Sequence, residues 1–252
     1  MMHSILRNKT RKFLIVLFWI TVWEILSLII NRDIYLPSPF YVFKVLIELL
    51  KSRDTYLTII CSTYRTLAGF LISCTTGIIL GYICGTNKFF HDLFNPLIGV
   101  MRVVPVMSII IIAIMWFSDT NVPIFAAFLM CFPIIWTNTV NGIKSADIKL
   151  LQMCKVYSIK KMHIIKSVYF YSAVPYIEAA MISALGIGWK VTSAAEVLSL
   201  PKYSIGGHLY DSKVYLEIPE LFAWTVIIIS LSCIFETILK KLFKSRNYDQ
   251  SY

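Results

Sequence analysis

Long apolar runs, separated by short polar segments, dominate the sequence. Six runs are each close to the roughly 20 residues that a helix needs to cross a lipid bilayer. The first contains only one charged residue, Glu24. We therefore predict an all-α integral membrane protein with six transmembrane helices. The predicted spans are residues 13–30, 57–84, 93–117, 122–141, 172–200 and 220–243, which form one membrane domain (13–243) between an N-terminal segment (1–12) and a C-terminal tail (244–252).

Glycine and proline positions add detail to two of these spans. Gly69, Gly77, Gly81 and Gly85 recur at spacings of four and eight residues along the second span, which gives a smooth face for close packing against another helix. Pro105 interrupts the third span. There we expect a packing kink in a helix that still crosses the membrane.

The most cationic loop lies between the fourth and fifth spans, at residues 142–171. Its lysines are Lys144, Lys149, Lys155, Lys160, Lys161 and Lys166. Leu150, Met153, Cys154 and Tyr157 fall on one face of a helix, and a second helical run follows Ser158. We predict two short amphipathic helices joined at Ser158 that form a docking surface. The alternative is a basic loop that only reflects membrane topology.

The charge distribution is typical of a membrane protein. The formal net charge is +10, yet 58% of the residues are hydrophobic and only 15% are charged, too few to coat a soluble domain of this size. With both termini inside, the inner segments hold 15 Lys and Arg residues and the outer segments hold 6. This bias follows the positive-inside rule, so we expect a multi-pass protein with both termini in the cytosol and no nucleic-acid partner.

Several short motifs occur in order along nearly the whole chain. They are LPSP (36–39), STYRTLAGF (62–70), GIILGYICG (77–85), MRVVP (101–105), NTVNGIKSAD (138–147), ALGIGWKVTSAAEVL (184–198) and SIG (204–206). In this order they resemble the membrane-spanning permease subunit of a bacterial, binding-protein-dependent ABC importer, of the nitrate/sulfonate/taurine branch. The resemblance implies a type I ABC importer permease fold in the bacterial cytoplasmic membrane, with a cytosolic coupling-helix loop between the fourth and fifth helices.

In the family that it resembles, this loop sits in a groove of the ATP-binding subunit, and the chain departs from the family's signature there. Gln152 stands at the family's glutamate, Cys154 at an alanine and Ser158 at a glycine. Glycine adopts φ > 0 freely, whereas another residue loses roughly 1–2 kcal/mol, so we expect a milder turn at Ser158 or a looser match to the family. The residues that the resemblance assigns to contact with the ATP-binding subunit are Leu151, Gln152, Met153, Cys154, Tyr157, Ser158 and Lys161.

Ionisable residues within the spans are costly and for that reason are usually functional. Arg102, Lys190 and Glu196 are the candidates for a translocation path. Lys190 and Glu196 lie six residues apart, too far to pair along one helix, so each needs water or a partner on another span. Structural ion pairs between helices and a polar path for an anionic solute both remain open.

These features predict a transport subunit without chemistry of its own. The chain lacks a G-x-x-x-x-G-K-[ST] phosphate loop, so ATP and Mg²⁺ are expected on a separate ATP-binding subunit, with no cofactor, metal or catalytic residue in this chain. Further expected partners are a second permease subunit, a copy of this chain or a relative, and an extracytoplasmic solute-binding protein. A secondary transporter and a membrane enzyme are the alternatives, although neither an internal repeat of spans nor a catalytic motif favours them. The sequence does not identify the solute.

Overall fold

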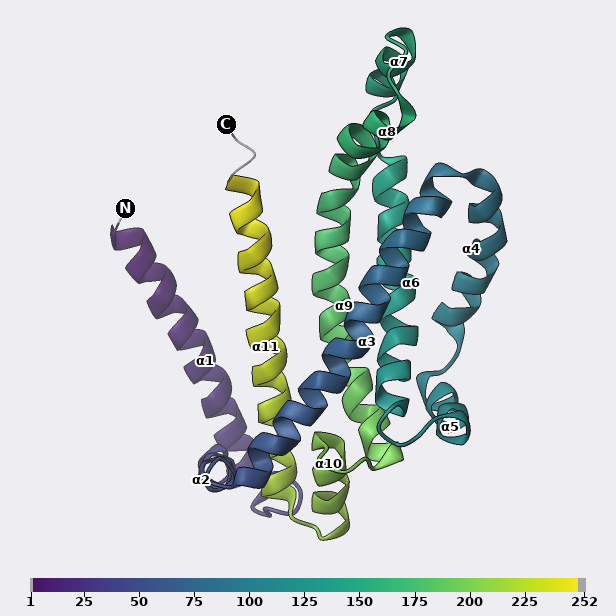
Figure 1. Ribbon diagram of the computed structural model, residues 1–252. Coiled ribbons are helices and arrows are strands. Elements are labelled where there is room, and N and C mark those ends of the chain that lie inside the picture. Colours follow the sequence, from purple (N-terminus) through teal and green to yellow (C-terminus); the bar gives the residue numbers. More distant parts are fainter. Residues whose placement is uncertain (1, 249–252) are drawn as a thin grey trace.

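The computed structural model describes the backbone of residues 2–248 and the side chains of residues 11, 14–160 and 162–244, and within these limits the secondary structure is helical throughout (Figure 1). The helices are α1 (Met2–Ile30), α2 (Pro39–Leu49), α3 (Arg53–Thr86), α4 (Lys88–Val103), α5 (Val106–Trp116), α6 (Val122–Lys144), α7 (Ile148–Val156), α8 (Lys161–Ile164), the π-helix η1 (Ile165–Tyr169), α9 (Phe170–Ser199), α10 (Ile205–Val214) and α11 (Ile218–Tyr248).

Four continuous helices in the described part of the chain are long and apolar enough to cross a membrane. They are α3, α6, the run Met162–Ser199 that ends with α9, and the part of α11 at Ile218–Lys244. α4 and α5 meet the same criterion only as a pair, and α1 adds the shorter apolar stretch Leu14–Ile30. All six predicted spans therefore correspond to apolar helical segments, but the third has a different shape.

The third predicted span is not a single kinked helix. α4 and α5 are bent by 102° relative to each other, and Val104 and Pro105 between them have extended backbones, with ψ of 129° and 128°. Proline has no N–H to donate and disfavours helical geometry in the residue before it. The kink expected at Pro105 is therefore a sharp break, and the segment forms a broken span or a re-entrant turn.

The glycine face of α3 packs closely against α6, as the spacing predicted. A Cβ placed on Gly69 would lie 2.7 Å from the Cβ of Ala127, and one on Gly81 would lie 2.7 Å from the Cβ of Thr139. Atoms this close clash, so only glycine permits this helix separation. α9 packs against α6 and also contacts α3, and Trp189 of α9 is buried in the resulting core.

Different helices lie at the two ends of the molecule. In Figure 1, α7 and α8 lie at the top, and α1 begins and α11 ends toward the same side. α2, α5 and α10 lie at the bottom. Below, these are called the α7 end and the α10 end.

Candidate functional site

α7 is a nine-residue helix with defined caps at both ends. At its start, the Asp147 carboxylate accepts a hydrogen bond from the backbone N–H of Lys149 (2.8 Å). At its end, the N–H of Ile159 donates to the carbonyl of Cys154 (3.0 Å), and the N–H of Ser158 donates to that of Lys155 (3.1 Å). This pair of bonds is a Schellman motif, which normally places glycine at the left-handed residue.

Ser158 occupies that left-handed position, with φ = 49°. The turn is therefore not milder than one built on glycine, contrary to one of our two expectations. A left-handed conformation costs a residue with a Cβ about 1–2 kcal/mol. The chain keeps this sharp turn despite the cost, and the two hydrogen bonds of the Schellman motif close it.

The expected contact residues divide between the two sides of α7. Met153 and Tyr157 are exposed, with 50% and 72% of their surface accessible, and Gln152 is also exposed. Leu151 is half-buried and Cys154 is buried. Leu151 and Cys154 are three residues apart and share the covered side of α7, so the predicted face of Leu150, Met153, Cys154 and Tyr157 is not exposed as a whole. The side chain of Lys161 lies outside the described residues.

The second helical run after Ser158 is not a separate short helix. α8 and η1 continue into α9, and residues Met162–Ser199 form one helix of 38 residues. The π-helical part is marked by the bond from the N–H of Phe170 to the carbonyl of Ile165. The turn at Ser158 is thus joined directly to a spanning helix, so a displacement of α7 would be transmitted along α9.

Glu196 lies near the α10 end of α9, and its side chain is fully buried. Its Oε1 pairs with Nη1 of Arg65 on α3 at 2.9 Å. Its Oε2 accepts bonds from the Ser62 hydroxyl (2.9 Å) and from the backbone N–H of Gly206 (3.1 Å). Of the two interpretations left open, the structure supports an ion pair between helices for this residue. The assignment of Glu196 to the path is corrected, since a side chain without accessible surface cannot line one.

Arg65 extends this ion-pair network, which consists of Ser62, Arg65, Glu196 and Gly206. Its guanidinium also donates to the carbonyls of Lys202 (2.9 Å) and Tyr203 (3.0 Å), in the segment that connects α9 to α10. A Cβ on Gly206 would lie only 2.4 Å from the Cβ of Glu196. The network therefore fixes α3, α9 and α10 relative to one another.

The sequence analysis did not predict this network, although all four residues belong to motifs that it identified. Ser62 and Arg65 belong to the STYRTLAGF motif, Glu196 to ALGIGWKVTSAAEVL, and Gly206 to SIG. The two charges are 131 residues apart in sequence. Charged residues such as Arg65 and Glu196 are rare within apolar spans. This rarity could have suggested that the two residues pair, because a buried charge needs an opposite charge.

Arg102 and Lys190 remain exposed on apolar helices. The Arg102 side chain, in the last turn of α4, donates to the Thr137 hydroxyl of α6. Lys190 forms no ion pair with any acidic residue of the described chain. One turn before it on α9, a Cβ on Gly186 would meet nothing within 4 Å. This side of α9 is therefore uncovered within one chain, and a charged side chain on it is stable only next to water or to a partner.

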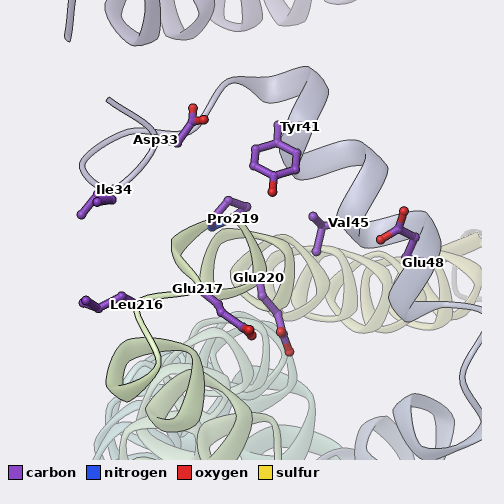
Figure 2. Close-up of a pocket in the computed structure, with 9 residues that line it drawn as sticks. All are labelled: Asp33, Ile34, Tyr41, Val45, Glu48, Leu216, Glu217, Pro219 and Glu220. Carbon is purple, nitrogen blue, oxygen red and sulfur yellow. The ribbon is translucent and has the colours of Figure 1, made fainter. Parts of the chain in front are cut away.

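An open pocket of about 460 Å³ lies at the α10 end, between α2 and the start of α11 (Figure 2). Its four acidic residues are Asp33, Glu48, Glu217 and Glu220. Figure 2 shows the carboxylates of Glu217 and Glu220 beside each other, and the hydrogen bond and negative charge of Glu220 raise the pKa of Glu217. No group of three or more His, Cys, Asp and Glu residues in the described chain is placed to hold a metal ion.

Comparison with known proteins links this architecture to a family. Residues 77–247 match the family model of the binding-protein-dependent transport system inner membrane component. The chain is 26% identical over 234 residues to the aliphatic sulfonates transport permease protein SsuC of Bacillus subtilis, covering 90% of this chain and 84% of the relative. It is 29% identical over 220 residues to the nitrate import permease protein NrtB of Synechococcus elongatus, covering 79% and 78%.

Solved structures agree on the fold. A chain of the MetNI methionine ABC transporter in an inward-facing conformation superposes with a TM-score of 0.62 at 13% identity, covering 77% of this chain and 98% of that one. A chain of an amino acid ABC transporter also has a TM-score of 0.62 at 13% identity, covering 81% and 98%. The secondary-transporter and membrane-enzyme alternatives are set aside. With the matched region spanning α11 and most of the helical core, the chain belongs to the binding-protein-dependent transport system inner membrane component family, as a multi-pass ABC importer permease subunit with the type I fold.

Proposed function

We propose that the chain forms half of the translocation path of an ATP-driven importer and that α7 docks on a separate ATP-binding subunit. The observation that carries this proposal is the exposed apolar surface of α7, joined through one turn to a 38-residue helix. ATP-driven movement of the partner would displace α7, and the stiff helix that ends with α9 would carry the displacement across the membrane. A second permease subunit and an extracytoplasmic solute-binding protein complete the proposed assembly.

The proposed orientation places the α7 end, with both chain termini, in the cytosol. The excess of Lys and Arg in the segments at that end supports it. The α10 end would then face the solute-binding protein.

Replacing Tyr157 with glutamate tests the docking role of α7. Tyr157 is 72% exposed, so the change should leave the helix bundle intact. A charge placed in an apolar contact typically costs an interface about 2 kcal/mol or more, roughly a 30-fold loss of affinity. We expect loss of the copurifying ATP-binding subunit and of ATP-dependent uptake, measured in membrane vesicles. Lys88→Glu, which also introduces a negative charge at an exposed position but lies outside α7, is the control. Normal uptake by the Tyr157 variant would refute the docking role.

We further propose that the solute is a small anion and that Arg102 and Lys190 contribute positive charge to its path. Both cations are exposed on apolar helices and lack an acidic partner within the described chain. The names of the sulfonate and nitrate permeases among the relatives agree with an anion. A positive potential along a water-filled path raises the local concentration of anions.

Lys190→Met separates charge from length in this proposal. The two side chains are similar in reach, so assembly should be preserved while the positive charge is removed. We expect solute uptake to fall about tenfold, which corresponds to roughly 1.4 kcal/mol of lost interaction. Uptake of the radiolabelled anion measures the effect, with Lys213→Met, whose side chain is exposed on α10, as the matched control. Unchanged uptake in the Lys190 variant would rule out a role for this charge.

A further inference from the structure

A second open cavity, of about 520 Å³, lies at the α7 end between α7, the α8–η1 segment and the last residue of α3. We call it the inner pocket. Leu151 of α7 and Ile164 of α8 form part of its apolar lining, and Gln152 and Lys155 of α7 also line it. The pocket thus combines an apolar interior with polar groups on one wall.

The polar groups of the inner pocket suit an anion. Lys155 brings three N–H donors and Gln152 two, and the Tyr169 hydroxyl of η1 adds another. Among the described residues that line the pocket, none is acidic. Asp147, the nearest acid along the chain, is occupied in capping α7.

The Gln152 and Lys155 side chains form no hydrogen bond or ion pair with another described residue. Both are exposed. Their donors are therefore available to a ligand that enters from outside the chain. A carboxylate on a short apolar stem satisfies both the donors and the apolar lining.

We propose that an acidic side chain of the ATP-binding subunit inserts into the inner pocket and is held there by Lys155 and Gln152. This inference rests on the proposed docking of α7. It adds that, in part of that contact, this chain provides the pocket and the partner provides the inserted side chain. It also adds that the partner's surface is acidic there. The position of the pocket favours a protein partner over a lipid headgroup, because α7 projects beyond the ends of the spanning helices (Figure 1).

The test measures the affinity of the purified ATP-binding subunit for the full chain in nanodiscs, at increasing salt. We expect Lys155→Met to weaken binding at least tenfold, and Gln152→Glu to weaken it similarly by placing a second carboxylate in the pocket. Lys149→Met is the matched control, since Lys149 is exposed on the same helix but does not line the pocket. Binding by the wild-type chain should weaken as salt increases. Of the variants, only Lys155→Met should show a smaller salt dependence than the wild type.

Each other outcome has a distinct meaning. If the wild-type chain binds no ATP-binding subunit, the proposed function itself fails. If the wild-type chain binds and the Lys155 and Gln152 variants bind equally well, the proposed function stands and the pocket contact is wrong. Equal weakening by Lys149→Met would indicate a general attraction by the cations of α7 and would also overturn the pocket. Loss of copurifying anionic phospholipid from Lys155→Met, with unchanged subunit binding, would assign the pocket to a lipid and reject the proposal.

Discussion

Glu196→Ala is expected to lower the free energy of unfolding by about 3–5 kcal/mol, the usual cost of removing one partner from a buried ion pair. The variant would leave the Arg65 guanidinium buried without its counter-charge, because Arg65 is only 3% exposed. It would also remove the acceptor of the Ser62 hydroxyl and of the Gly206 N–H. The expected result is a large drop in the melting temperature of the detergent-purified protein, together with a lower yield from membranes.

A double variant distinguishes the lost charge balance from lost packing. Replacing Arg65 and Glu196 together with Met and Leu removes both charges, and apolar replacement of a whole buried pair is often neutral or stabilising. Here recovery should be partial, since the carbonyls of Lys202 and Tyr203 would lose their donor. Lys190→Ala, an exposed charge on the same helix, is the control and should melt like the wild type. A wild-type melting temperature for Glu196→Ala would mean that the pair does not hold the fold.

Gly81→Val is expected to destabilise the bundle by about 3 kcal/mol, the upper part of the usual range for overpacking a core. A Cβ at this position would lie 2.7 Å from the Cβ of Thr139 and 3.0 Å from the carbonyl oxygen of Trp136. The second contact is with backbone, so relief requires α3 and α6 to move apart. Thermal unfolding in detergent measures the effect.

Gly99→Val provides the matched control for the glycine face. Gly99 also lies within a helix, α4, but a Cβ there would meet nothing within 4 Å. The same substitution should therefore leave the melting temperature nearly unchanged. Similar losses at both positions would show that the effect of valine does not arise from the contact between α3 and α6, since valine is the better helix former of the two residues.

The loop at residues 142–171 shows how far sequence reasoning reached at the candidate site. The helix before Ser158 followed from the periodicity of its apolar residues, and α7 is present. The orientation of Cys154 did not follow, because a short helix with apolar residues on more than one side does not specify which side is buried. The continuous helix from Met162 into α9 was missed because polar lysines interrupt its apolar pattern outside the membrane.

The sequence by itself determined the helical class, the approximate spans and the close-packed glycine face, since each depends on local composition and spacing. Hydrocarbon requires every backbone polar group to be bonded within the segment, so long apolar runs must become helices wherever they pack. Only the tertiary structure decided which charges meet. Glu196 and Lys190 are equally unusual in an apolar run, yet one is buried against Arg65 and the other is exposed. The difference arises from the angles and separations at which α3, α6, α9 and α10 pack, and these depend on contacts between residues far apart in the chain.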